Sequence, residues 1–300
     1  MSNKSTIPVI CFGEVLWDML PDGPQPGGAP LNVAYHLNKM SVATGIMSKV
    51  GNDLQGEKLI ALLDNWGINK QFLQLDSKYS TGEVIAKMNN GNEVSYEILF
   101  PVAWDFIEES NEAINKLTSS SYFIYGSLAS RNEVTRETLF KLLETDAIKV
   151  FDINLRPPFI GQDLLKALLE KADIVKFNQA ELEMVQVLFR GSMGNESSQI
   201  RFIMERFDVK EVIITKGESG ASYYKGDKAW HIWGNEVKVN DTIGSGDSFL
   251  AAFLAGHQMN EDPEKILKNA IAMGAFIATK KGGCPEYLLS EYTNFKNEMF

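Results

Sequence analysis

Short apolar runs alternate with amphipathic stretches along most of the chain, and this alternation limits the possible folds more than any other feature. The runs are four to six residues long, apolar on both faces and bounded by Gly, Asn, Asp or Lys. Such runs are typical of strands that are covered on both sides, as in a parallel sheet. They lie at 9–13, 122–125, 150–153, 174–177 and 212–215.

Helical periodicity fills the segments between these runs. It is found at 31–40, 56–66, 135–143, 164–171, 180–188 and 199–207. Strands that alternate with helices are joined by right-handed crossovers into one sheet. The sequence therefore predicts an α/β fold in which a central, mostly parallel sheet is flanked by helices.

Two segments interrupt this alternation. Residues 14–20 continue from the first strand, and 82–89 with 93–100 have the pattern of a hairpin that turns at 89–92. We predict one domain over 1–300 in which the segments 14–20 and 82–100 form a small β-subdomain, either a lid or a dimer surface. An ordinary antiparallel extension of the sheet edge explains the same pattern equally well.

The balance of charge disfavours several classes of partner. With 29 basic and 39 acidic residues the formal net charge is −10, and such a surface repels nucleic acid and anionic membranes. The two cysteines, Cys11 and Cys284, have no disulfide or metal-binding spacing. No stretch is apolar enough for a membrane span or a signal peptide, so we expect a cytoplasmic protein without nucleic-acid or membrane partners.

The segment 240–249 carries the strongest chemical signal. Gly244 and Gly246 flank Ser245, which allows the backbone amides of 244–247 to converge on one point. An apolar helix follows at 249–255, and its dipole adds partial positive charge at the same point. This pattern predicts an anion hole that suits a transferring phosphoryl group.

Asp247 is an unusual residue to place beside an anion hole. A bound phosphate repels a carboxylate, so its presence favours a role as the general base that takes a proton from an attacking hydroxyl. The alternative is an ordinary carboxylate in the first turn of a helix. The neighbouring Asp241-Thr242 pair and the apolar helix favour the base.

These residues resemble a known family. Asp241-Thr242-x-Gly244-x-Gly246-Asp247 is similar to the C-terminal signature of the ribokinase-like (PfkB) sugar kinases, and 27–34 is similar to their N-terminal signature. The resemblance extends over about 7–287, with the elements in family order. It implies a ribokinase-like fold with a β-sheet lid and transfer of the γ-phosphate of ATP to a sugar hydroxyl. It also implies that Asp247 is the base and that Gly244, Ser245 and Gly246 form the anion hole.

The resemblance also implies two groups of binding residues. Glycines let a ligand approach the backbone closely, and Asn offers a donor and an acceptor to an alcohol. Without the resemblance, Asn32 is equally explained as a residue at the start of a helix that binds no ligand, and Arg156 as a member of a surface ion pair. The sugar-binding residues would be Asp18, Gly27, Gly28, Asn32, Asn154 and Arg156. The nucleotide-binding residues would be Asn178, Glu181, Thr215, Lys216, Gly217, Gly220 and Asn269.

Metal ions and a second subunit follow from the same resemblance. Glu181 would act on Mg²⁺, through water, although it is equally well explained as a first-turn helix carboxylate. Backbone carbonyls near Asp241 and Ile243 would be the place for a monovalent cation such as K⁺. Many relatives pair through the β-lid, so a homodimer is expected.

The particular residues within the motifs distinguish branches of the family. The segments 27–30, 126–128 and 154–158 resemble the fructokinase branch, which implies conversion of fructose to fructose 6-phosphate. A 2-keto-3-deoxygluconate, ribose or nucleoside kinase of the same family is the alternative. A protein that binds sugar or nucleotide without catalysis is the alternative from another class. Asp247 argues against it, because binding alone requires no base there.

Overall fold

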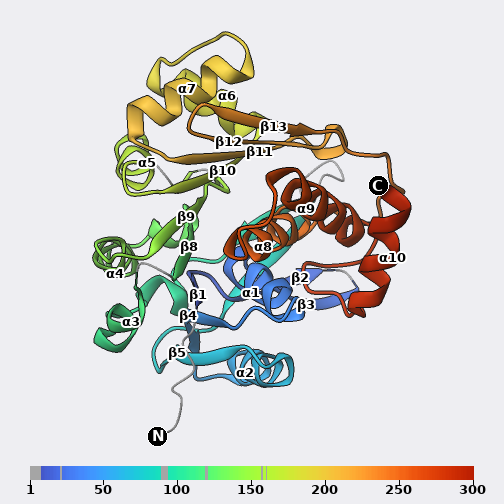
Figure 1. Ribbon diagram of the computed structural model, residues 1–300. Coiled ribbons are helices and arrows are strands. Elements are labelled where there is room, and N and C mark those ends of the chain that lie inside the picture. Colours follow the sequence, from blue (N-terminus) through green and yellow to red (C-terminus); the bar gives the residue numbers. More distant parts are fainter. Residues whose placement is uncertain (1–7, 21, 89–93, 119–120, 157, 160) are drawn as a thin grey trace, which may run out of the picture.

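The structure, a computed structural model, describes residues 8–20, 22–88, 94–118, 121–156, 158–159 and 161–300. The nine strands of its larger sheet follow the order β13-β12-β11-β10-β9-β8-β1-β4-β5, which Figure 1 shows from β13 at the top to β5 at the bottom. Seven are parallel, and β12 and β13 are antiparallel. The strands are β1 (Val9–Phe12), β4 (Thr44–Gly51), β5 (Asn69–Asp76), β8 (Tyr122–Gly126), β9 (Ile148–Asp152), β10 (Ile174–Asn178), β11 (Glu211–Thr215), β12 (Ala221–Lys225) and β13 (Lys228–Ile232).

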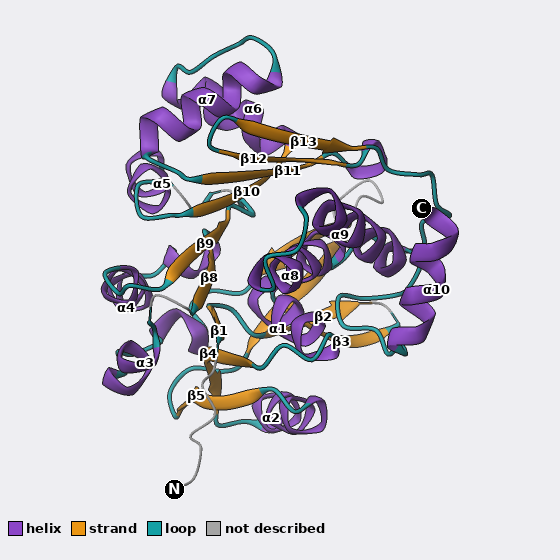
Figure 2. Ribbon diagram, in the orientation of Figure 1, coloured by secondary structure: helices purple, strands orange, loops and turns teal. Residues whose placement is uncertain are grey.

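Helices cover both faces of this sheet (Figure 2). Alternate residues of β1 belong to two separate cores: Val9 and Cys11 to one, Ile10 and Phe12 to the other. The first core lies under α1 (Ala29–Lys39), α2 (Leu54–Trp66), α8 (Ser245–Gln258), α9 (Pro263–Ala278) and α10 (Leu289–Met299). The second lies under α3 (Asn111–Lys116), α4 (Glu133–Leu143), α5 (Gln162–Leu169), α6 (Gln179–Phe189) and α7 (Glu196–Phe207).

This architecture confirms the predicted α/β fold. Every predicted strand and helix is present, with bounds that differ by a few residues. Among the described residues, no helix is both long and apolar enough to cross a membrane.

A smaller sheet of four strands stands apart from the larger one. Its order is β3 (Gly23–Gly27), β2 (Leu16–Leu20), β6 (Gly82–Met88) and β7 (Val94–Ile98). The two segments that interrupt the alternation therefore do form strands, and the turn predicted at 89–92 lies outside the described residues. The strand β3 was not predicted because its sequence, Gly-Pro-Gln-Pro-Gly, disfavours strands. Its prolines are tolerated at the edge of the sheet.

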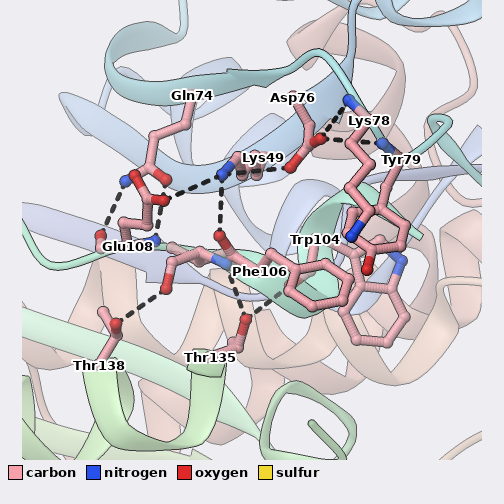
Figure 3. Close-up of polar contacts among 11 residues, drawn as sticks. Lys49, Gln74, Asp76, Lys78, Tyr79, Trp104, Phe106, Glu108, Thr135 and Thr138 are labelled. Carbon is pink, nitrogen blue, oxygen red and sulfur yellow. Dashed lines mark hydrogen bonds and ion pairs between the residues drawn. The ribbon is translucent and has the colours of Figure 1, made fainter. Parts of the chain in front are cut away.

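Two of the connections between the sheets, from β5 to β6 and from β7 to β8, are attached to β4 and β5, as Figure 3 shows. The buried Lys49 of β4 lies 3.2 Å from an Asp76 carboxylate oxygen and donates to the carbonyl of Phe106 at 3.1 Å. The other Asp76 oxygen accepts the amides of Lys78 and Tyr79, each at 2.8 Å. Tyr79 in turn stacks on Phe106, with ring centroids 4.0 Å apart. The chain entering β6 and the chain leaving β7 are thus held together.

Candidate active site

The residues 244–247, which the sequence predicts to form an anion hole, lie at the N-terminus of α8. Gly244 precedes the helix with φ 74°, and a Cβ there would overlap Gly283, so glycine is needed on both counts. Ser248 makes the first helical hydrogen bond, from its amide to the Gly244 carbonyl at 2.8 Å. The amides of Gly246 and Asp247 lie in the first turn, where a helix supplies no acceptor. The Ser245 amide, by contrast, donates to the Thr242 carbonyl at 3.2 Å, so this amide stabilises the turn before the helix.

Asp247 points from this turn toward Asn32 of α1. The side-chain Nδ2 of Asn32 donates to Asp247 Oδ2 at 2.8 Å. Burial, reinforced by the charge of Asp152, raises the pKa of the Asp247 carboxyl to about 6, against opposing effects of Asn32, Lys176 and Arg156. The group is therefore ionised at neutral pH and has a raised affinity for a proton. Both properties suit a general base.

A buried lysine, which the sequence analysis did not single out, lies beside the N-terminus of α8. Lys176 of β10 donates to both carboxylate oxygens of Asp152, at 2.9 and 2.8 Å. A Cβ on Gly246 would stand 3.5 Å from its Nζ. Burial acts to lower the pKa of Lys176, but the Asp152 charge outweighs it and raises the pKa, so the ammonium stays charged. The available signal was a lysine within an otherwise apolar run.

A polar cavity of about 650 Å³ opens in front of Asp247. The smaller sheet contributes part of its wall through Leu16, Leu20, Val84, Tyr96 and Ile98. Most of the predicted sugar-binding residues line it, namely Asp18, Gly28, Asn32, Asn154 and Arg156. Gly27 lies just behind, where a Cβ would overlap the Asp18 carboxylate.

Two further carboxyl groups of this cavity have raised pKa values. Burial, with the charges of Asp247 and Asp241, raises the pKa of Asp18 to about 6. Burial raises the pKa of Glu14 to about 7, and its Oε2 has no hydrogen-bond partner in the described part of the chain. Glu14 was not among the predicted site residues. A cavity with several such acceptors suits a ligand that is rich in hydroxyl groups.

A second, more apolar cavity of about 390 Å³ adjoins the first. The two share three lining residues, Thr215, Thr242 and Gly246. Glycines and apolar side chains form most of its wall, including Gly217, Gly220, Phe249, Ile271, Gly274, Ala275, Ala278 and Met299. Its largely apolar lining suits a planar aromatic base.

Four predicted nucleotide-binding residues do not line this cavity: Asn178 and Glu181 line the polar cavity instead, and Lys216 and Asn269 line neither. Lys216 turns to Ser222 Oγ at 2.6 Å and to a carboxylate oxygen of Glu196 at 2.7 Å. Asn269 is two positions before Ile271, the first lining residue of α9, and its carbonyl accepts the Tyr292 hydroxyl at 3.0 Å. The helix α9 does contribute to the wall, through Ile271, Gly274, Ala275 and Ala278.

Two acidic residues near the polar cavity are held by backbone amides. Glu181 accepts the amides of Leu155 at 3.0 Å and Asn178 at 2.8 Å. Asp241 accepts the amide of Ile243 at 3.0 Å and that of Gly282 at 2.9 Å. No group of three or more His, Cys, Asp or Glu in the described ranges is arranged to hold a metal ion.

The fold and the two joined cavities define a kinase of small hydroxylated molecules, and comparison with known proteins identifies its family. The family model described as pfkB family carbohydrate kinase matches residues 23–287. The chain therefore belongs to this family, which confirms the predicted class of enzyme, a carbohydrate kinase.

Similar proteins have related names. Probable fructokinase-5 of Arabidopsis thaliana is 29% identical over 308 residues, which cover 92% of this chain and 93% of the relative. Fructokinase-2 of Solanum lycopersicum is 27% identical, with 92% of each chain covered. The crystal structure of a Vibrio cholerae fructokinase with fructose, ADP and calcium has a TM-score of 0.81 at 24% identity, covering 97% of this chain and 99% of that one. That of a Xylella fastidiosa fructokinase with bound ATP has a TM-score of 0.83 at 22% identity, covering 98% and 99%. The ribokinase-like fold is confirmed.

Proposed function

We propose that this protein is a fructokinase, which transfers the γ-phosphate of ATP to a hydroxyl of fructose and yields fructose 6-phosphate. The observation that carries the proposal is the junction of the polar and apolar cavities at Thr215, Thr242 and Gly246. A sugar in the first and a nucleotide in the second would meet at the N-terminus of α8. Asp247 stands on the sugar side of that junction.

The chemistry follows from the residues at the junction. The sugar hydroxyl gives its proton to Asp247 as its oxygen attacks the γ-phosphorus, and ADP leaves. The amides of Gly246 and Asp247, with the nearby Lys176 ammonium, stabilise the charge on the transferring group. The smaller sheet, which forms one wall of the sugar cavity, keeps out water that would compete as acceptor.

Magnesium would enter with the nucleotide. Mg²⁺ prefers several water ligands and phosphate oxygens, and it neutralises phosphate charge. Because both oxygens of Glu181 already accept amides, this residue fits a role through water. A K⁺ site at carbonyls near Asp241 and Ile243 is part of the proposal, as is a cytoplasmic location.

The names of the relatives and the segments 27–30, 126–128 and 154–158 support fructose as the acceptor. The test is ADP formation from Mg·ATP with fructose, 2-keto-3-deoxygluconate, ribose and adenosine. We expect turnover with fructose and a product phosphorylated at the 6-position. Turnover with another acceptor only would refute the fructokinase assignment and keep the kinase. The absence of acceptor-dependent turnover would support a non-catalytic binding protein.

A homodimer that forms through the β-lid is also part of the proposal. Tyr96 of β7 and Phe100 just after it are 60% and 54% exposed, which leaves apolar surface on the smaller sheet. We expect a dimer in sedimentation velocity, and a weakened dimer for Phe100→Asp. A monomer across micromolar concentrations would contradict this arrangement.

A further inference from the structure

The loop 282–287 is attached to α1 and contacts the N-terminus of α8. His36 of α1 donates through Nε2 to the Gly283 carbonyl at 2.9 Å, and the Tyr35 hydroxyl donates to the Pro285 carbonyl at 2.6 Å. A Cβ on Gly283 would overlap the side-chain amide of Asn32, and a Cβ on Gly244 would overlap Gly283. The loop therefore packs closely against the residue that holds Asp247.

A cysteine in this loop completes a chain of hydrogen bonds that ends at the base. The thiol of Cys284 donates to Asn32 Oδ1 at 3.2 Å, and Asn32 Nδ2 donates to Asp247 Oδ2 at 2.8 Å. Burial, together with the charges of Asp247 and Asp18, raises the pKa of the thiol well above its usual range. The sulfur thus keeps its proton at neutral pH and can act as the donor.

The direction of this chain depends on the thiol. A side-chain amide has an acceptor end and a donor end, and rotation about its last bond by half a turn exchanges them. With the donor end on Asp247, Asn32 stabilises the carboxylate; with the acceptor end there, two oxygens repel each other. A donor on the opposite side selects the first arrangement. Cys284 supplies that donor.

We propose that Cys284 is a positioning residue for the phosphoryl-transfer reaction: its thiol fixes the orientation of the Asn32 amide, which in turn holds the Asp247 carboxylate. The proposal rests on the assignment of Asp247 as the base in the proposed function. It adds a residue from a loop that lies 252 positions beyond Asn32 in the sequence.

The effect on the titration of Asp247 follows from its surroundings. The hydrogen bond from Asn32 lowers the pKa of this carboxyl, so losing the bond raises it. The other charged or titratable groups that act on Asp247 or respond to its charge stay in place, namely Glu14, Asp18, Asp152, Arg156 and Lys176.

The test compares Cys284→Ala, which removes the donor, with Cys284→Ser, which keeps one. For Ala we expect the acid limb of the kcat/KM profile to move up by about 0.5–1 pH unit and kcat at pH 7 to fall about 3- to 30-fold. The KM for ATP should stay within about two-fold, because the nucleotide cavity is not lined by Cys284. The Ser variant should keep the wild-type profile.

Cys11→Ala is the matched control, because it removes the other thiol from the core of β1, outside both cavities. It should leave the pH profile unchanged, and melting curves should show all three variants folded. A wild-type profile for Cys284→Ala would overturn the proposal, as would equal losses in the Ala and Ser variants.

A second readout separates this proposal from the proposed function. The carboxyl ¹³C shift of Asp247 reports its titration in ligand-free protein, with Asp247→Asn identifying the signal. If the wild type phosphorylates no acceptor, the proposed function fails, and the ¹³C titration still tests the hydrogen-bond chain. A titration midpoint that is the same in wild type and Cys284→Ala would overturn it.

Discussion

Burial raises the pKa of the Asp247 carboxyl to about 6 from an ordinary 3.8, so the charged form is less favourable in the folded chain than in the unfolded one. The folded protein therefore binds a proton more tightly between pH 4 and 6. Above about pH 6 the carboxylate is a destabilising charge, and below about pH 4 the penalty is absent. The feature that suits Asp247 to accept a proton from a substrate therefore lowers the free energy of unfolding of the protein at neutral pH.

Asp247→Asn removes this charge and keeps an oxygen that can accept from Asn32. We expect turnover to be lost and the free energy of unfolding at pH 8 to rise by about 1–2 kcal/mol. The gain should shrink toward pH 4, where the wild-type carboxyl is protonated. Urea unfolding of both proteins at pH 8 and pH 4.5 measures the difference. A variant less stable than the wild type at pH 8 would contradict this account of the carboxyl.

A carboxyl group near the opposite end of α8 has a lowered pKa, the reverse of Asp247. Glu211 of β11 accepts from the Tyr223 hydroxyl at 2.6 Å and from His257 Nε2 at 2.9 Å, and it pairs with Lys225 at 2.8 Å. Burial acts to raise the pKa of Glu211, but these contacts outweigh it and lower the pKa to about 2 from 4.5. The cluster joins β11, β12 and α8.

Since the folded-state pKa of Glu211 is depressed, its stabilisation is present above about pH 4.5 and is lost as pH falls toward 2. We expect Glu211→Gln to lower the free energy of unfolding at pH 7 by about 2 kcal/mol. The difference from wild type should narrow between pH 4.5 and 3. Glu205→Gln, at an exposed position of α7, is the control and should change little. A pH-independent difference for Glu211→Gln would rule out this explanation.

At the scale of elements, five of the nine strands of the large sheet (β1, β8, β9, β10 and β11) were predicted, because each of these is specified by its own apolar run. The strands β4, β5, β12 and β13 were not predicted. Residues 122–125 and 212–214 are buried on both faces of the sheet, so their apolar pattern can be recognised without knowledge of the neighbouring strands. By contrast, β3 contains two prolines, and only its pairing with β2 makes it a strand. The α10 helix was not predicted; Tyr292 is its one buried residue, so its sequence carries little of the apolar periodicity that marks a packed helix face.

At the scale of the whole molecule, the smaller sheet can form a wall of the polar cavity only if its connections hold it in a fixed position relative to the larger sheet. Lys49 and Asp76, whose side chains are each 8% exposed, link β4 and β5 to the chain that enters the smaller sheet. Removing one partner leaves a buried charge without its counterion, which is costly.

We expect Lys49→Met to lower the free energy of unfolding by about 2–4 kcal/mol, as measured by urea unfolding. Lys141→Met, which breaks the exposed pair with Glu109, should cost less than about 1 kcal/mol. The KM for sugar should rise in the Lys49 variant, because the smaller sheet forms a wall of the sugar cavity. Equal effects of the two substitutions would show that the connection does not depend on this pair.

The candidate site shows where prediction from sequence ends. Asp247, Gly244 and Asn32 belong to short motifs, so their types and spacing indicated their neighbourhood. Lys176 and Cys284 matter through contacts with residues far away in the sequence, which a local pattern does not contain. Lys216 belongs to a motif, but its side chain turns to Ser222 and away from the predicted nucleotide site, because a position in a motif does not determine where a long side chain points.

The central claim is that Asp247 is the general base of sugar phosphorylation, and the most direct test is the turnover number of Asp247→Ala with saturating fructose and Mg·ATP. We predict a loss of about 10²–10⁴-fold in kcat, with ATP affinity by calorimetry nearly unchanged. Turnover close to that of the wild type would contradict the claim.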